Sequence, residues 1–86
     1  MQFGRDDFMD FVKDYNITRR EKDIVQLIFD GCTNKMIAEK LDIVESTVKS
    51  HVKRIYKKVG VNNRVSLLNL YQSHVQQQRQ QKLVMA

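Results

Sequence analysis

The apolar residues of this chain recur every three or four positions from near its start to about residue 75, which is the spacing of one face of a helix. In residues 5–14 this pattern consists of Phe8, Met9, Phe11 and Val12, with Tyr15 following them. The chain has 3 glycines and no proline, and no stretch alternates between apolar and polar residues as a strand would. The sequence therefore predicts an all-α chain that begins with a helix over residues 5–14.

Capping residues divide the next part of the chain into two short helices. Thr18 and Glu21 stand at the spacing of a capping box, in which each side chain binds the backbone amide of the other residue. Gly31 supplies a left-handed end for that helix, and Thr33 is placed to cap the next one. The residues predicted to be buried are Ile24, Val25, Leu27, Ile28, Ile37, Ala38 and Leu41.

A turn over residues 42–45 leads to a longer helix, over about residues 46–59, which has two opposed faces. At about 100° per residue, its apolar and cationic residues fall on opposite sides. The apolar stripe consists of Val48, Val52, Ile55 and Val59, and the cationic stripe consists of Lys49, Lys53, Arg54 and Lys57. A short helix, a turn and a basic helix are the elements of a helix-turn-helix. We therefore predict that residues 46–58 lie in the major groove of DNA.

The distribution of charge supports this prediction more strongly than the net charge does. The chain has 15 Lys+Arg and 10 Asp+Glu, which gives a net charge of +5, and many small domains are as basic. All ten acids precede residue 46, so the helix over residues 46–58 has no acid to pair with its cations. The C-terminal half is therefore the electropositive half, which would face DNA phosphates.

The final helix is predicted to begin at residue 64, with Asn62 or Asn63 as its cap, and to end near residue 75. Its apolar residues cover more than half of its circumference, which is more than one core-facing stripe needs. Leu67, Leu70 and Tyr71 form the surplus and predict a homodimer contact. Packing on the N-terminal helix or on a further domain is the alternative. The polar tail, residues 76–86, is expected to prolong the helix and then to fray.

Four short motifs, whose spacing needs no gap, resemble the DNA-binding domain of the LuxR family, also called the NarL/FixJ or GerE family. They are residues 17–21 (ITRRE), 31–38 (GCTNKMIA), 46–52 (STVKSHV) and 60–64 (GVNNR). The resemblance covers about residues 17–75. It implies a four-helix, tetrahelical helix-turn-helix domain of bacterial transcription regulators, among them response regulators. In that family the third helix reads the major groove and the fourth mediates dimerisation.

The resemblance also implies which residues touch DNA. Base contacts are expected at Lys49, Ser50 and Lys53. Contacts with the DNA backbone are expected at Thr33, Asn34, Lys35, Thr47, His51 and Lys57, to which the cationic stripe adds Arg54. The expected function is sequence-specific binding of double-stranded DNA, as a dimer on an inverted repeat, with RNA polymerase as a further candidate partner. Two rival interpretations are a protein-interaction module that sequesters a partner regulator and a promoter-recognition module like sigma region 4.

Two residues depart from the family pattern. Arg19 stands where the family usually has proline, and the first turn of a helix tolerates either. Val44 stands where serine or threonine usually caps the reading helix. Because valine cannot cap, either Glu45 or Ser46 takes over or the helix start is weaker by roughly 1 kcal/mol.

The predicted domain organisation has three parts. Residues 1–16 are an N-terminal helical extension or a linker remnant, residues 17–75 are the DNA-binding domain, and residues 76–86 are the polar tail. The chain is either a stand-alone member of the family or an excised piece of a larger regulator.

Other classes of function find no support in the sequence. His51 and His74 have no acid or nucleophile at a workable spacing, and together with the single cysteine, Cys32, they form no metal-binding cluster. We therefore expect no enzyme, no cofactor and no metal. No apolar run approaches the roughly 18 residues of a membrane span, and no signal peptide is evident. One cysteine fits a reducing compartment, so a cytoplasmic protein without a membrane partner is expected.

Overall fold

The computed structural model describes residues 5–85 of the 86-residue chain and the side chains of residues 6–77. The helices are α1 (Arg5–Asp14), α2 (Arg19–Phe29), α3 (Asn34–Leu41), α4 (Glu45–Val59) and α5 (Arg64–Met85). Residues 5–85 contain no strand, so the prediction of an all-α fold with an extra N-terminal helix is confirmed.

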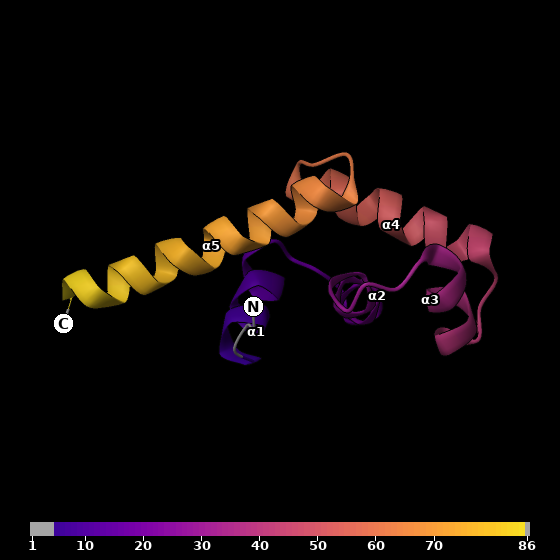
Figure 1. The fold of residues 1–86 in the computed structure, drawn as a ribbon, viewed down its shortest axis with the longest axis horizontal. Coiled ribbons are helices and arrows are strands. Elements are labelled where there is room, and N and C mark those ends of the chain that lie inside the picture. The colour runs from indigo at the N-terminus through magenta and orange to yellow at the C-terminus, as the bar shows by residue number, and fades with distance from the viewer. Residues whose placement is uncertain (1–4, 86) are drawn as a thin grey trace.

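The helices form two layers. α4 and α5 run along the long axis on one side of the molecule, and α1, α2 and α3 lie on the other side (Figure 1). α2 packs on both α3 and α4, α3 packs on α4, and α1 packs on α5. The C-terminal part of α5 extends past the other helices, which contributes to the elongated dimensions of 47 × 22 × 21 Å.

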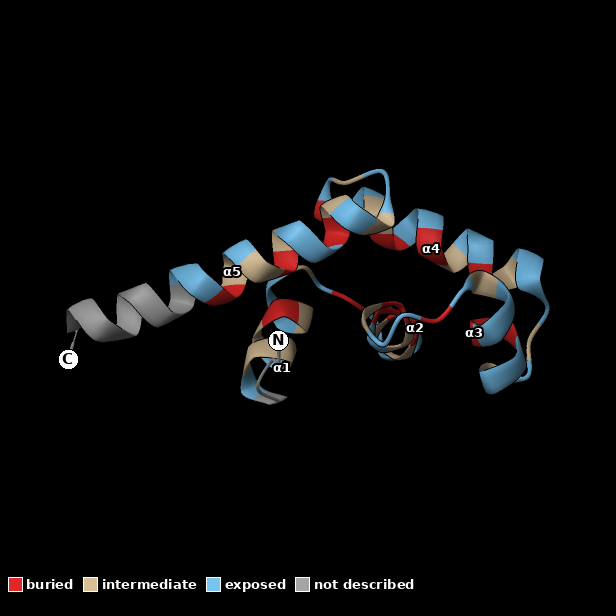
Figure 2. Ribbon diagram, viewed as in Figure 1, coloured by how far each residue is buried: buried red, intermediate tan, exposed pale blue. Residues whose placement is uncertain are grey.

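The core lies between these two layers, where the buried parts of the helices face one another (Figure 2). Its buried residues are Phe11, Ile17, Ile24, Val25, Ile28, Cys32, Ile37, Ala38, Val48, Val52, Ile55, Val59, Leu67, Tyr71 and Val75. Burying one large aliphatic or aromatic side chain stabilises a fold by roughly 1.5–3 kcal/mol. The apolar stripe predicted for the basic helix therefore holds α4 on the core.

The helix ends follow the capping signals in the sequence. The amide of Thr18 donates to Glu21 Oε1 at 3.0 Å, and the amide of Glu21 donates to Thr18 Oγ1 at 3.2 Å, which completes the predicted capping box. Thr33 and Asn63 each accept a hydrogen bond from the amide three residues further on, so Asn63 is the cap of α5. Gly60 ends α4 with a φ of 78°, a left-handed conformation that glycine adopts without a steric cost.

α5 continues to Met85, ten residues past the end predicted near residue 75. Residues 76–82 are glutamines, an arginine and a lysine, which are good helix formers, and neither glycine nor proline interrupts them. The polar tail therefore prolongs the helix. The fraying expected at its end stays a prediction.

α1 docks on the core through aromatic residues. The Phe11 ring lies edge-on to Tyr71 with ring centroids 5.0 Å apart, and Phe29 of α2 lies 4.7 Å from the same tyrosine ring. Both separations fall in the range of favourable aromatic pairs. At the end of α1, Asp14 Oδ2 lies 2.7 Å from His74 Nε2 of α5. The helix predicted over residues 5–14 is therefore present and packs on α5.

The docking of α1 corrects part of the predicted dimer contact. Leu67 and Tyr71 have exposed fractions of 0%, so neither side chain is available to a second chain in this conformation. Their surplus apolar surface is covered from within the chain, which was the alternative interpretation. Leu70 remains partly exposed, and up to residue 77 the exposed apolar residues of α5 are Val65 and Leu68, which the prediction did not include.

Candidate nucleic-acid interface

A tight turn sets the direction of α4 relative to α3. Asp42 ends α3 in the left-handed conformation, with φ of 55° and ψ of 48°, which aspartate tolerates better than most residues. The amide of Ile43 donates to the carbonyl of Ala38 at 3.0 Å, and the Ile43 side chain packs against the core. Because this corner is both hydrogen-bonded and packed, α3 holds α4 in one orientation.

α4 presents one buried side and one cationic side. Val48, Val52, Ile55 and Val59 are buried, as the helical arithmetic predicts. The predicted base-contact residues Lys49, Ser50 and Lys53 are all exposed, and so are Arg54 and Lys57. Along α4 the blue, exposed surface faces away from α2 and α3 (Figure 2). The cations of the predicted stripe are therefore available to a partner that approaches from outside.

Ser50 differs from its lysine neighbours in how its polar group is engaged. Its hydroxyl donates to the carbonyl of Ser46, one turn earlier, at 3.1 Å. The hydroxyl hydrogen is therefore used inside the helix, and the oxygen keeps its capacity to accept.

The remaining residues predicted to contact the DNA backbone are divided between α3 and α4. Thr33 and Lys35 are exposed at the start of α3, whereas Asn34 is partly buried. Thr47 and His51 are partly buried on α4, and His51 Nδ1 is buried without a hydrogen-bond partner among the described residues. His51 therefore has only part of its ring available for a contact outside the chain.

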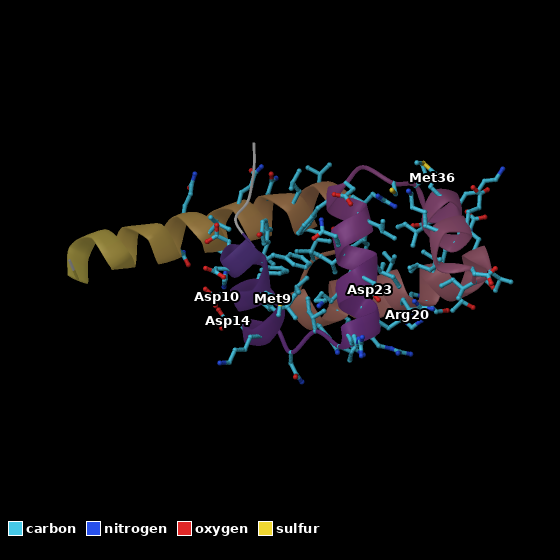
Figure 3. All side chains as sticks on the ribbon, turned by 90° about the horizontal axis from the view of Figure 1, so that it is seen from below. Met9, Asp10, Asp14, Arg20, Asp23 and Met36 are labelled. Carbon is cyan, nitrogen blue, oxygen red and sulfur yellow. The ribbon has the colours of Figure 1, made fainter. Side chains whose placement is uncertain are left out.

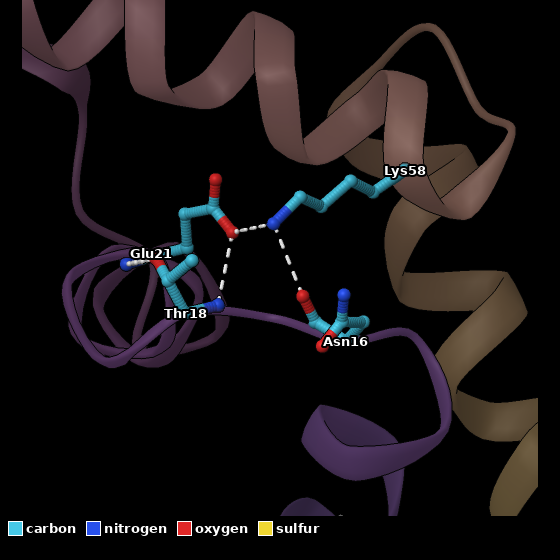
Figure 4. A network of polar contacts seen from close by, with 4 residues as sticks. All are labelled: Asn16, Thr18, Glu21 and Lys58. Atoms are coloured by element: carbon cyan, nitrogen blue, oxygen red, sulfur yellow. Dashed lines mark hydrogen bonds and ion pairs between the residues drawn. The ribbon is translucent and has the colours of Figure 1, made fainter.

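Lys58 follows the cationic stripe in the sequence and is exposed, but its ammonium group is engaged within the chain. Its Nζ lies 2.7 Å from Glu21 Oε1 and donates to the carbonyl of Asn16 at 3.0 Å (Figure 4). Glu21 Oε1 also accepts from the amide of Thr18, so the capping box of α2 and the end of α4 share one carboxylate oxygen. This network ties α4 to α2 and to the loop that follows α1.

The Glu21 carboxylate is 1% exposed, and its surroundings act on its pKa in opposite directions. Burial works to raise the pKa, whereas the hydrogen bond from Lys58, the hydrogen bonds from Thr18 and the charge of Lys58 work to lower it. The lowering contributions prevail, so the pKa lies below its ordinary value of 4.5. Glu21 Oε2 is buried without a hydrogen-bond partner among the described residues.

α4 begins without a side-chain cap. Val44 occupies the cap position, is 65% exposed and makes no capping hydrogen bond, and the helix starts directly after it at Glu45. Of the outcomes predicted from the missing hydroxyl, neither Glu45 nor Ser46 replaces the cap. The negative charge of Glu45 in the first turn is favourable to the helix dipole and offsets part of the loss.

Arg64 is a residue to which the sequence analysis assigned no role. Its Nη1 donates to the carbonyl of Cys32 at 2.6 Å, and its Nη2 donates to Asn34 Oδ1 at 3.0 Å. The start of α5 is thereby joined to the start of α3. Arg64 belongs to one of the four motifs, but neither its charge nor its spacing indicates these partners, which lie 32 and 30 residues away in the sequence.

The charges of the molecule are separated between its two sides. Figure 3 shows the side of α1 and α2, where Asp10, Asp14 and Asp23 lie, with α4 behind them. Arg20 is close to Asp23 in the sequence of α2, so this side carries both signs of charge, whereas α4 carries no acid after Glu45. An anionic partner is therefore favoured on the exposed side of α4.

A compact set of helices in which a short helix and a tight turn hold a basic, half-buried helix defines a helix-turn-helix protein. The family model described as "Bacterial regulatory proteins, luxR family" matches residues 15–71. The chain therefore belongs to this family of bacterial regulatory proteins.

Three relatives illustrate the range of the family. The chain is 57% identical over 49 residues to the nitrate/nitrite response regulator protein NarL of Escherichia coli (strain K12). These 49 residues make up 57% of this chain and 23% of NarL. It is 52% identical over 48 residues to the transcriptional regulatory protein DegU of Brevibacillus brevis, an alignment that covers 56% of this chain and 20% of DegU. It is 34% identical over 55 residues to the HTH-type transcriptional regulator MalT of Vibrio campbellii, an alignment that covers 64% of this chain and 6% of MalT. The aligned segment thus spans less than a quarter of each of these relatives.

The described residues offer neither a metal site nor a membrane-spanning helix. Within residues 5–85, no group of three or more histidine, cysteine or acidic side chains is placed to hold a metal ion. None of the helices in the described part of the chain is long and apolar enough to cross a membrane.

Proposed function

We propose that the chain binds double-stranded DNA in a sequence-specific manner, with α4 in the major groove. The observation that carries this proposal is the exposed side of α4, where lysines and an arginine follow Glu45 with no further acid, on a helix whose other side is buried. The major groove of B-DNA admits one α-helix. Lys49 and Lys53 are hydrogen-bond donors only and favour the O6 and N7 acceptors of guanine. Ser50 contributes little discrimination, because its hydrogen is already bonded within the helix.

Contacts with the DNA backbone provide most of the affinity in this proposal. The residues that make them are Thr33, Asn34, Lys35, Thr47, His51, Arg54 and Lys57. Each phosphate that a cation neutralises releases a condensed counterion, so binding weakens as salt increases. α3 packs on α4, and its first residues are therefore carried on the same rigid unit as the reading helix.

A homodimer through α5 is the second part of the proposal. Val65 and Leu68 are 69% and 37% exposed and lie three residues apart, on one side of the helix. Apolar surface of this kind on two copies favours a two-fold contact, with Leu70 at its margin. Two reading helices would then lie about one DNA turn, or about 34 Å, apart, and an inverted repeat is the expected target.

Such a regulator would act in the bacterial cytoplasm, and RNA polymerase is the partner through which it would affect transcription. Selection of bound duplexes from a random pool tests the DNA-binding part directly. We expect enrichment of one motif arranged as an inverted repeat. Enrichment of a single half-site would remove the dimer from the proposal, and the absence of any enriched motif would overturn sequence-specific binding.

A further inference from the structure

Arg64 is the first residue of α5, a position that its own helix does not favour. The start of a helix carries a partial positive charge, so an acidic residue is stabilising there and an arginine is not. The partners of Arg64 lie instead at the start of α3, where it donates to the carbonyl of Cys32 and to the side chain of Asn34. Both acceptors are reached by one planar guanidinium, which holds them in a single relative geometry.

The chemistry of these two groups decides which end of the Asn34 amide faces outward. A guanidinium has donors and no acceptor, so it can bind only the oxygen of the amide. With Oδ1 held by Arg64 at 3.0 Å, the NH₂ group of Asn34 is turned to the side away from the guanidinium. Without this partner, the last torsion of asparagine is broad and nearly two-fold, so oxygen and nitrogen would exchange places freely.

We infer that Arg64 is a positioning residue for DNA binding, which acts by holding the donor end of Asn34 ready for a phosphate oxygen. The inference rests on the proposed contact between Asn34 and the DNA backbone. A phosphate oxygen accepts hydrogen bonds and donates none, so an amide that presents NH₂ attracts it and one that presents oxygen repels it. Arg64 also holds the Cys32 carbonyl, and thereby the chain directly before Thr33, the cap of α3.

A double-mutant cycle between Arg64 and Asn34 tests this inference. The variants are Arg64→Lys, Asn34→Ala and the double variant, and the measured quantity is the Kd for a duplex of random sequence at low salt. Lysine keeps the charge of Arg64 but cannot serve both acceptors with one planar group. We expect each single variant to weaken binding by roughly tenfold, since each removes the same hydrogen bond to phosphate. We expect the double variant to bind no more weakly than Asn34→Ala does.

The same cycle separates a positioning role from a structural one. If Arg64 only braces the fold or touches DNA itself, Arg64→Lys weakens binding equally in the Asn34→Ala background, and the inference is overturned. Arg19→Lys is the matched control, because Arg19 is exposed and lies outside the interface, and its Kd should equal that of the original chain. If the original chain binds no duplex, the proposed function itself fails. If the original chain binds but the cycle shows no coupling between Arg64 and Asn34, only the inference about Arg64 fails.

A second variant, Asn34→Asp, tests the inference even if Arg64→Lys does not fold. Asn34→Asp retains an oxygen for the guanidinium and replaces the NH₂ group with a second, charged acceptor. Thermal unfolding should show a stability equal to or higher than that of the original chain, because an acid is favourable at the first turn of α3. The affinity for the duplex should fall by about tenfold or more, since the carboxylate meets a phosphate. Undiminished affinity for DNA in this variant would overturn the inference.

Discussion

Lys57 and Lys58 are neighbours in α4 with the same chemistry and opposite surroundings. Lys57 is exposed on the cationic side, whereas Nζ of Lys58 lies 2.7 Å from the buried carboxylate of Glu21. One step along a helix turns the side chain by about 100°, and this rotation is enough to move a lysine from the outer surface to the contact with α2. At the scale of single residues, position on the helix therefore decides the role more than residue type does.

The two lysines make a matched pair for mutation. Lys57→Ala should leave the free energy of unfolding nearly unchanged and reduce the slope of log K against log salt by about 0.9, because one phosphate contact is lost. Lys58→Ala should leave that slope unchanged and destabilise the fold by about 1 to 3 kcal/mol, because Glu21 stays buried without its partner. Urea unfolding and DNA titration at several salt concentrations measure both quantities. A salt slope that changes in Lys58→Ala but not in Lys57→Ala would reverse the assignment.

The pKa of Glu21 makes a prediction about acid stability. In the folded chain, the pKa of Glu21 lies below its ordinary value of 4.5. The ionised carboxylate therefore stabilises the fold fully at pH values above the pKa that Glu21 has in the unfolded chain. This stabilisation decreases as the pH falls below about 4.5 and is lost once the pH passes below the folded pKa. Glu21→Gln should therefore be less stable than the original chain at neutral pH, and the difference should narrow on acidification. Urea unfolding from pH 7 to pH 3 checks this, and a difference that stays constant over the range would contradict it.

At the scale of the element, α4 is well packed on the core along its length but lacks a side-chain cap at its first residue. Its four buried residues bind it to the core, and Gly60 ends it cleanly. Its first turn has Val44 in place of a hydroxyl residue and depends on the turn after α3 for its placement. The start of the helix lies directly before Lys49 and Ser50, so the weakest part of α4 is next to the residues proposed to read DNA.

Restoring a capping hydroxyl should strengthen that start. Val44→Thr places an acceptor for the free amides of the first turn and should raise the free energy of unfolding by about 1 kcal/mol. Val44→Ala is the matched control, because alanine at the same position cannot cap the helix either, and its effect should stay within about 0.5 kcal/mol. Urea unfolding of both variants without DNA makes the comparison. Equal stabilities for the two variants would show that the Val44 position does not limit α4.

At the scale of the whole molecule, α1 changes which surface of α5 is available. Phe11 and the rest of the aromatic cluster cover Tyr71, and Leu67 is buried as well, so the broad apolar face seen in the sequence is largely internal. Among the side chains that the structure describes, the exposed apolar ones on α5 are Val65 and Leu68. Much of the apolar surface on which the rival protein-interaction interpretation depended is therefore occupied within the chain.

A charge placed at the exposed side of α5 tests the proposed dimer. Leu68→Glu should leave the monomer folded, because Leu68 is 37% exposed, and should abolish self-association and cooperative binding to an inverted repeat. Met9→Glu is the control, since Met9 is an exposed apolar residue on α1, away from α5's exposed side. Sedimentation and titration of one-site and two-site duplexes provide the readouts. Cooperative binding that survives in Leu68→Glu would move the dimer contact elsewhere.

The order of the helices, most of their caps and the two faces of α4 were predictable from the sequence, because each depends on residues within a few positions of one another. The end of α5 was not. The capping box of Thr18 and Glu21 and the stripe from Val48 to Val59 are local patterns of this kind. The same is true of the missing cap at Val44. Periodicity and capping act within one helix, so a single sequence shows them directly.

Which surfaces meet was decided only by the tertiary structure. The bond from Lys58 to Glu21 joins residues 37 apart, and the bond from Arg64 to Asn34 joins residues 30 apart. The burial of Tyr71 likewise depends on where α1 docks. A helical pattern shows that an apolar or charged face exists but does not name the element that covers it, because any helix of suitable size and charge could do so. The sequence by itself therefore determined the helices and the basic side of α4, and the packing of distant helices determined which of those residues remain free to meet DNA.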